Sequence, residues 1–243
     1  MLANAGAGSR RQIERWIAEG RVLINGKTAQ LGDCVVGTER VKLDGREIRI
    51  GPRRGRVRHE HLAYHKPAGE ITTRDDPEGR PTIFERLPEP RRGRWISVGR
   101  LDVTTSGLLL MTTDGELAHR LMHPSYEIVR AYAVRLLGAA RDEQLERLRR
   151  GVELEDGIAR VESIEPRGGT GVNVWYELAL KEGRNREVRR LFDALGLTVS
   201  RLIRIGYGPI ALERLRRGQS RFLDDRELAV LYAAVGLARS RHG

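Results

Sequence analysis

From residue 61 to the end of the chain, strand-like and helix-like segments alternate without a repeated strand–helix–strand period. The hydrophobic pattern predicts strands over 61–65, 95–98, 107–112, 128–137, 158–165, 172–180 and 199–205. Apolar residues at helical spacing predict helices over 114–122, 141–150, 184–195 and 225–236. This order disfavours a regular parallel α/β sheet. It predicts an α+β fold with a mixed, mainly antiparallel sheet and helices packed on it.

The first fifty residues are predicted to form a small unit of their own. In "GSRRQIERWIAEGRVLINGK", Ser9 and Gln12 have the spacing of a capping box at the start of a helix, and Gly20 is placed to end it. Three apolar residues at helical period form the buried face: Ile13, Trp16 and Ile17. The runs "VLING" and "RVKLDGREIRI" follow as strands with Asn-Gly and Asp-Gly turns.

Three arginines of this helix lie off its apolar face: Arg10, Arg11 and Arg15. Charged residues on such a face are either solvated or bind an anionic partner, and spacing alone leaves both interpretations open. The whole chain is basic, because 44 Lys and Arg exceed 33 Asp and Glu to give a formal charge of +11. A charge of this size favours a polyanion, with nucleic acid as the first candidate.

Composition also limits the class of protein. Hydrophobic residues make up 40% and charged residues 32%, which is typical of a folded globular chain. We find no apolar run long enough to span a bilayer and no signal sequence, so we expect a cytoplasmic protein with no membrane partner. Cys34 is the single cysteine, so no internal disulfide forms.

Neither a metal site nor a nucleotide loop is indicated. His59 and His61 are a conceivable ligand pair, but no further His, Cys or carboxylate cluster accompanies them. The chain has no GxxxxGK[ST] or GxGxxG motif. In "GPRRGRVRHEH", arginines stand beside glycine and proline with few apolar residues, which is typical of a linker. The expected organisation is a domain over 1–50, a basic linker over 51–60 and a larger domain over 61–243.

One carboxylate stands out in "GRLDVTTSGLLLMTTDGEL", where Asp102 precedes small hydroxyl residues and a strongly apolar run. A lone Asp is most often a turn former or a helix cap. Asp114 fits that description, because Thr113 and Glu116 have capping-box spacing around it at the start of a predicted helix.

The stretch "KEGRNREVRRLFDALG" offers a partner for Asp102. Val188 and three later apolar residues form one helical face, with Gly196 as a stop signal. Four arginines cluster near the helix start, where cations oppose the helix dipole: Arg184, Arg186, Arg189 and Arg190. A phosphate backbone or a buried carboxylate would compensate them. An Asp beside such an arginine stays ionised, as a nucleophile must.

The segment "LANAGAGSRRQIERWIAEGRVLING" resembles an S4 domain, a small RNA-binding module, over nearly all of residues 1–50. The resemblance implies RNA rather than DNA as the partner. It implies that Arg10, Arg11 and Arg15 contact that RNA.

Three further segments resemble, in order, the motifs of pseudouridine synthases: "GRLDVTTSGLLLMTTDGEL", "EIVRAYAVRL" and "EGRNREVRRLF". These enzymes detach a uracil from its ribose within RNA and reattach it through carbon. The resemblance covers most of residues 61–210. It implies that Asp102 is the catalytic aspartate, Tyr132 the active-site aromatic and Arg189 the basic partner of Asp102. Leu202 matches an apolar position that lines the family's pocket, and Arg100 one that contacts RNA.

With the S4 module in front, the order of motifs is most similar to the group that modifies ribosomal RNA of the large subunit. It implies 23S more than 16S RNA, or a large-subunit assembly intermediate, as the partner of a monomeric enzyme that needs no cofactor and no metal. Arg184 and Arg186 are further candidates for RNA binding. Attack by Asp102 at the sugar and attack at the base both stay open.

Taken singly, these residues have ordinary interpretations. Tyr132 alternates with apolar residues and would otherwise be assigned to a sheet face, and Arg189 to the surface. A non-catalytic ribosome-assembly factor with the same fold is the alternative from another class. A metal-dependent aspartyl-phosphate hydrolase is disfavoured, because Thr104 stands where that motif has its second Asp.

Overall fold

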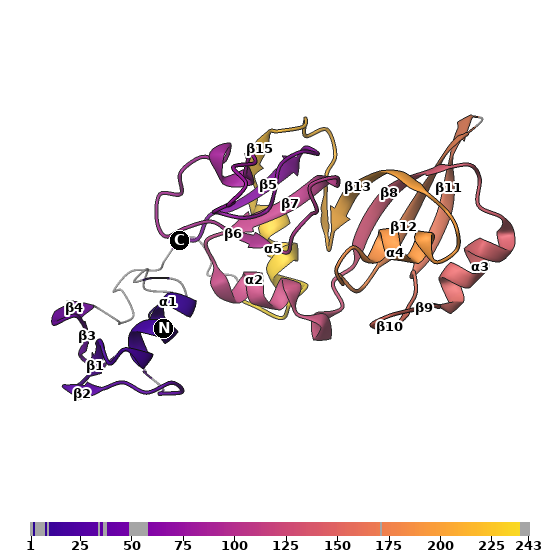
Figure 1. The fold of residues 1–243 in the computed structure, drawn as a ribbon. Helices are drawn as coiled ribbons and strands as arrows, with labels where there is room; N and C mark the ends of the chain where they lie inside the picture. Colours follow the sequence, from indigo (N-terminus) through magenta and orange to yellow (C-terminus); the bar gives the residue numbers. More distant parts are fainter. Residues whose placement is uncertain are drawn as a thin grey trace. The chain divides into compact units, whose positions relative to one another are not determined.

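The structure, a computed structural model, describes residues 2, 8, 10–33, 35, 38–48, 58–170 and 172–238. Ser9, Cys34 and residues 51–57 of the expected linker therefore lie outside the described residues. The chain divides into two compact units, Met1–His59 with Glu89–Trp95 and Glu60–Pro88 with Ile96–Gly243. Both are drawn in Figure 1.

Among its described residues, the smaller unit has one helix and a four-stranded antiparallel sheet of order β2-β1-β3-β4. Its elements are α1 (Arg10–Ala18), β1 (Val22–Ile24), β2 (Lys27–Thr28), β3 (Val41–Leu43) and β4 (Arg46–Ile48). Ile13 is buried and Trp16 and Ile17 pack around it, as the helical period predicts. Positive φ at Asn25-Gly26 and Asp44-Gly45 confirms both tight hairpin turns.

The larger unit is built on a nine-stranded sheet whose path runs β11-β12-β8-β13-β7-β5-β15, with β6 and β14 paired at its side. Its strands are β5 (His61–Lys66), β6 (Ile96–Val98), β7 (Ser106–Thr112), β8 (Arg130–Leu137), β11 (Ser163–Thr170), β12 (Asn173–Leu180), β13 (Val199–Tyr207), β14 (Ile210–Ala211) and β15 (Ser220–Phe222). Among the named strands of the described residues, every pair is antiparallel except β13 with β7. The expected mixed, mainly antiparallel sheet is confirmed.

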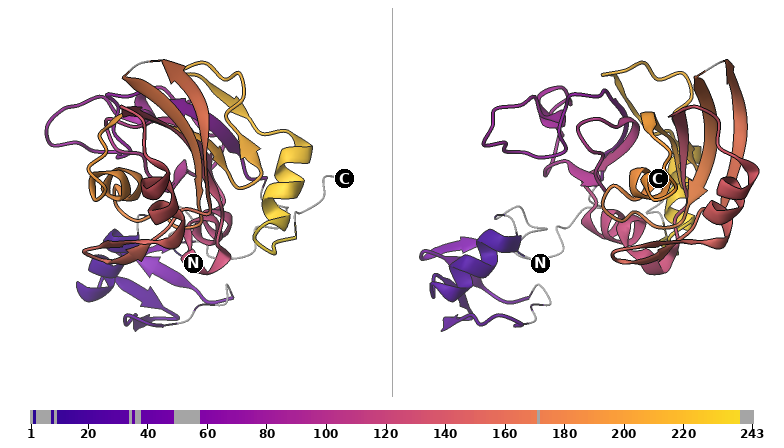
Figure 2. Two further views of the ribbon diagram at one scale, coloured as in Figure 1. Left: turned by 90° about the vertical axis from the view of Figure 1, so that its right-hand side faces the viewer. Right: turned by 45° about the vertical axis from the view of Figure 1, so that its right-hand side comes forward.

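Two apolar clusters fix the helices on this sheet. One joins α3 (Asp142–Arg150) and α4 (Glu187–Asp193) to β8, β11, β12 and β13, and the other joins α2 (Gly115–Met122) and α5 (Asp225–Ala233) to β7 and its neighbours. Figure 2 (left) shows α4 and α5 on opposite sides of the strands. Short 3₁₀ turns occupy Ile83–Glu85 and Pro124–Tyr126.

Two predicted segments differ from the structure. The single strand expected over 158–165 is wrong, because Gly157–Ala159 (β10) pairs with Val152–Leu154 (β9) as a separate hairpin and β11 begins only at Ser163. The helix expected over 184–195 begins later, at Glu187. Arg186 has a left-handed φ of 48°, and the Glu187 side chain accepts a hydrogen bond from the main-chain N of Arg184. These contacts form a turn in place of the first helical residues.

Asp114 is itself the N-cap of α2, in place of the expected Thr113, and accepts hydrogen bonds from the main-chain N of Glu116 and Leu117. The Tyr232 hydroxyl donates to its second carboxylate oxygen at 2.7 Å, which ties α5 to α2. The C-terminal helix thus packs against the core, as its apolar face predicts.

The parallel contact between β7 and β13 joins the two halves of the sheet. It pairs Ile203 with Ser106 and Arg204 with Gly107. Gly107 has φ +118°, and a Cβ there would lie 2.3 Å from the main-chain O of Arg204 and 2.4 Å from its N. The Arg204 side chain reinforces the contact, because its Nε donates to the main-chain O of Leu108 at 2.8 Å. Only glycine fits at this position.

Lys66, the last residue of β5, is fully buried and holds the loop that precedes β7. Its Nζ donates to the main-chain O of Pro67, Asp102 and Thr105 at 3.0, 3.0 and 2.9 Å. Three acceptors thus match the three donors of an ammonium group. Burial nevertheless lowers the pKa of Lys66 to about 8.

We expect Gly107→Ala to destabilise the protein strongly, because the methyl group meets the Arg204 main chain and the residue keeps a left-handed φ. Gly138→Ala is the matched control, since Gly138 has φ +89° but nothing within 4 Å of the added Cβ. In urea unfolding, the free energy of unfolding should fall by about 1–3 kcal/mol for the control and by clearly more for Gly107→Ala. Equal losses would contradict the close contact.

The lowered pKa of Lys66 also predicts a pH dependence. The unfolded chain, with the ordinary lysine pKa of 10.5, binds more protons than the folded one between pH 8 and 10.5. The free energy of unfolding should therefore rise with pH in this window, by up to about 2 kcal/mol between pH 7.5 and 9.5 relative to Lys66→Met. Urea titrations of both proteins at the two pH values measure this difference. A constant difference would show that Lys66 keeps its ordinary pKa.

Candidate functional site

A cavity of about 330 Å³ opens in the larger unit where the loop before β7, the strands β8 and β13 and the loop before α4 meet. Six of the predicted site residues line it: Arg100, Asp102, Tyr132, Arg184, Arg186 and Leu202. Arg11 and Arg15 belong to the smaller unit, where both are exposed on α1. Arg10 lies in the same helix, but its side chain is outside the described residues.

Asp102 is half-buried on the loop before β7. Its main-chain O accepts hydrogen bonds from Lys66 Nζ and from the main-chain N of Thr105, both at 3.0 Å. Within the part of the chain that the structure describes, no hydrogen bond or ion pair engages its carboxylate. The backbone of Asp102 is therefore fixed while its carboxylate is open to the cavity.

Tyr132 lies on β8 with its ring packed in the same apolar cluster as Leu202 and Val188. It pairs across the sheet with Arg204 of β13 and Leu178 of β12. Among the described residues, no group bonds to its hydroxyl. The cavity thus offers an aromatic ring with a free phenol, and Leu202 beside it.

Arg189 does not pair directly with Asp102. Its Nη1 donates to the main-chain O of Val199 at 3.0 Å and its Nη2 to that of Thr104 at 3.4 Å, and it is not among the cavity-lining residues. Burial, followed by Arg186, lowers the pKa of Arg189, whereas the charge of Asp102 raises it. The expected ion pair is replaced by a bond to the Asp102 loop, because main-chain carbonyls accept from both Nη atoms, while Nε has no partner among the described residues.

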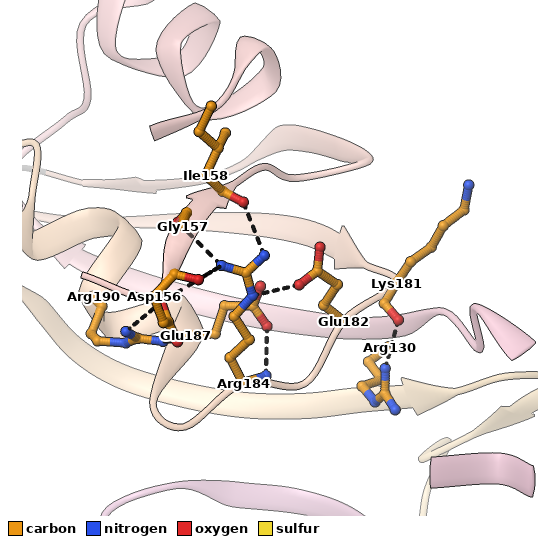
Figure 3. Close-up of polar contacts among 9 residues, drawn as sticks. All are labelled: Arg130, Asp156, Gly157, Ile158, Lys181, Glu182, Arg184, Glu187 and Arg190. Carbon is orange, nitrogen blue, oxygen red and sulfur yellow. Dashed lines mark hydrogen bonds and ion pairs between the residues drawn. The ribbon is translucent and has the colours of Figure 1, made fainter. Parts of the chain in front are cut away.

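Figure 3 shows that Arg184 is a structural clamp. Its guanidinium pairs with Glu182 and donates to the main-chain O of Asp156, Gly157 and Ile158 in the β9–β10 hairpin. Arg190 adds two bonds to the Asp156 carboxylate, at 2.9 and 2.8 Å, and so lowers the pKa of that group. Contacts within the protein therefore occupy most donors of the residue predicted to bind RNA.

Arg100 and Arg186 are different, because both are exposed at the cavity and neither has an ion-pair or hydrogen-bond partner for its side chain among the described residues. Their guanidinium groups are available to an anionic ligand. Together with Arg11 and Arg15 of the smaller unit, they leave the RNA-binding prediction in place for four exposed arginines.

Several residues of the cavity were not predicted from the sequence, foremost Arg130, Glu187 and Arg204, which are all buried. Alternation along a strand was the available signal. In "VRAYAVRL" it puts Arg130 on the face of Tyr132, and in "RLIRIGYG" it puts Arg204 on that of Leu202. Arginine and glutamate are rarely buried, so these positions were not predicted to be buried in the cavity wall.

In the ranges described, no three His, Cys, Asp or Glu side chains come together in a way that would hold a metal ion. His61, considered above as a ligand, is buried with its Nδ1 2.9 Å from the Thr112 hydroxyl. Over the same ranges, no helix combines the length and the apolar character that crossing a membrane requires.

Comparison with known proteins agrees with this architecture. Residues 60–194 match the RNA pseudouridylate synthase family and residues 1–41 match the S4 domain. A crystal structure of a pseudouridylate synthase superposes with a TM-score of 0.65 at 28% identity, covering 95% of this chain and 96% of that one.

Curated relatives are more similar in sequence. Ribosomal large subunit pseudouridine synthase B of Pseudomonas aeruginosa is 55% identical over 239 residues, which cover 98% of this chain and 62% of that protein. The protein of the same name from Escherichia coli (strain K12) is 56% identical over 221 residues, or 90% of this chain and 76% of that protein. This chain thus spans somewhat less than two thirds of the first relative. By sequence and by fold, it belongs to the RNA pseudouridylate synthase family and carries an S4 domain ahead of the family's own domain.

Proposed function

We propose that this protein isomerises one uridine to pseudouridine in the 23S RNA of the large ribosomal subunit, with Asp102 as the nucleophile. The observation that carries the proposal is the free carboxylate of Asp102 on a fixed backbone, in a cavity that also holds Tyr132 and Leu202. The names of the relatives favour large-subunit RNA as the substrate. The enzyme is proposed to act in the cytoplasm as a monomer.

The chemistry fits the residues present. Isomerisation breaks the C1′–N1 bond, forms a C1′–C5 bond and exchanges a proton on C5 for one on N1, so its net balance consumes no second substrate. Asp102 attacks either C1′ of the ribose or C6 of the base, and an ionised carboxylate serves both routes. Tyr132 stacks on the base and its free hydroxyl assists proton removal.

RNA has to be reshaped before this chemistry. A uridine within a folded RNA is extruded from its stack, at a cost of roughly a few kcal/mol, before its glycosidic bond can enter a cavity. Exposed Arg100 and Arg186 at the cavity hold the adjoining phosphates. Arg189 is proposed to act through the loop, which it contacts at Thr104, and through its positive charge near Asp102.

Asp102→Asn should abolish pseudouridine formation, with a loss of at least about 10³-fold, because the amide cannot act as the nucleophile. RNA affinity should change less than twofold, since the substitution conserves shape. Asp114→Asn is the control from the same stretch, because Asn is an equally good helix cap and its amide group can donate to the Tyr232 hydroxyl oxygen in place of the bond that Asp114 accepts. Carbodiimide-block primer extension on unmodified 23S transcript should show one new stop with the native protein and the control, and none with Asp102→Asn.

The non-catalytic alternative gives a different result. An assembly factor would bind RNA but leave no stop on 23S RNA, on 16S RNA or on immature large-subunit particles. Its binding would also be indifferent to Asp102→Asn. That set of results would overturn the proposed function.

RNA affinity should fall steeply with salt, because phosphate contacts release counterions. Replacing both Arg11 and Arg15 with Gln should reduce the slope of log K against log salt by about 1–2, as expected for two lost phosphate contacts. Arg147→Gln removes an exposed charge from α3 and should leave the slope unchanged. Filter binding between 50 and 300 mM salt, a range of about 0.8 in log units, measures it. An unchanged slope in the double variant would exclude these arginines from the interface.

A further inference from the structure

Three residues of the cavity wall carry buried polar atoms with no partner among the described residues: Thr105 (Oγ1), Glu187 (Oε1) and Arg204 (Nη2). Buried polar groups in proteins are nearly always hydrogen-bonded, so an unpaired one calls for an explanation. Of the seven such atoms among the described residues, these three share one cavity, which favours a ligand with hydrogen-bonding groups of its own. Arg204 is the most informative of the three, because its charge makes an unpaired donor most costly.

The rest of the Arg204 side chain is held in place. Arg204 is 2% exposed, its Nε donates to the main-chain O of Leu108, and its guanidinium lies 5.0 Å from the ring centroid of Tyr207. Its main chain is fixed at the contact with Gly107. The cavity wall beside Tyr132, the neighbour of Arg204 across the sheet, thus carries a buried donor that no described group accepts from.

A second cation lies on the same ring. The guanidinium of Arg130, which is 7% exposed, is 5.1 Å from the Tyr207 centroid and donates to the Tyr207 hydroxyl and to the main-chain O of Lys181. Across the described part of the chain, no carboxylate forms an ion pair with Arg130 or Arg204. Buried Glu187 in the same wall interacts electrostatically with Arg130, so one carboxylate faces two buried cations. An excess of buried positive charge is unfavourable unless an anion or a group gaining negative charge arrives.

We propose that Arg204 donates from Nη2 to a carbonyl oxygen of the target uracil and stabilises the negative charge that the base acquires during the reaction. This inference rests on the proposed function. The depth of Arg204 and its position beside Tyr132 and Leu202 favour a base over the RNA backbone as its partner. Arg130, whose guanidinium also lies against the Tyr207 ring, adds to the positive electrostatic potential around Arg204.

The electron balance supports this role on both routes. If Asp102 bonds to C1′, the C1′–N1 electron pair goes to the base and spreads over N1, O2 and O4. If Asp102 bonds to C6, the C5–C6 π pair moves onto O4. In both cases a carbonyl oxygen gains charge, which falls again when C5 bonds to C1′. On the first route, the C1′–O pair returns to the Asp102 carboxylate as C5 attacks C1′. On the second, C1′ transfers from N1 to C5 and leaves its bonding pair on N1, and Asp102 leaves C6 when the C5 proton is lost. In both cases C5 loses its proton to solvent and N1 takes one up. A preorganised donor at that oxygen acts like an oxyanion hole.

The first test is the single-turnover rate of Arg204→Gln at saturating RNA. We expect a loss of about 10²–10³-fold, as for removal of one oxyanion donor. The Kd for RNA should stay within about threefold. Gln retains an amide that can reach the Leu108 carbonyl, and Arg204→Lys serves if Gln does not fold. Arg201→Gln, which removes an exposed arginine from the same strand, should keep the native rate.

The second test identifies the contact. Synthetic 23S fragments carry 2-thiouridine or 4-thiouridine at the target, because sulfur is a weaker hydrogen-bond acceptor than oxygen. For one of the two, the effect of the thio group and that of Arg204→Gln should be non-additive, with a coupling of at least about fivefold. Additive effects for both would overturn the proposal.

Two further outcomes separate the hypotheses. If Arg204→Gln weakens RNA binding while the rate at saturation stays native, Arg204 contacts a phosphate and the proposal is overturned. If the native protein itself forms no pseudouridine in these RNAs, the proposed function fails first. Native activity with an unimpaired Arg204→Gln overturns this inference alone.

Discussion

The parallel contact of β7 with β13 is the constraint on which the larger unit depends. Each half of the sheet has its own apolar cluster and helices, and this contact is where the two halves meet. It sets the loop of Asp102, which leads into β7, beside the face of β8 and β13 that carries Tyr132, Leu202 and Arg204. The absence of a side chain at Gly107 permits the close approach.

Cations bound to main-chain carbonyls hold the walls of the cavity. Lys66 binds main-chain carbonyls of the loop that carries Asp102, and Arg184 fixes the β9–β10 hairpin to the segment before α4. Such contacts act on the backbone and so impose little on side-chain identity. The arginines of the chain thus fall into two groups, since some are held by contacts within the protein and others, such as Arg100, are exposed at the cavity.

Much of this arrangement could be predicted from sequence. Helical period, strand alternation and Asn-Gly turns predicted the class of sheet and nearly all long elements. The resemblance of the motifs singled out Asp102, Tyr132 and Leu202, which line one cavity in the structure. Local pattern failed where tertiary contacts decide. The left-handed backbone of Arg186 makes α4 begin later than predicted, and the β9–β10 hairpin takes up part of the strand expected over 158–165. Buried Lys66 and Arg204 could not be anticipated, because their carbonyl partners are distant in sequence.

The contrast between the hydrogen-bonded main chain of Asp102 and its unbonded carboxylate has a consequence for conformational entropy. The main-chain O of Asp102 accepts hydrogen bonds from Lys66 and Thr105, whereas its carboxylate has no hydrogen bond to a described residue that would have to break before it rotates. Binding of RNA then orders only a short side chain, with two torsions, rather than a loop. In the proposed attack, Asp102 therefore loses little backbone freedom on the way to the transition state.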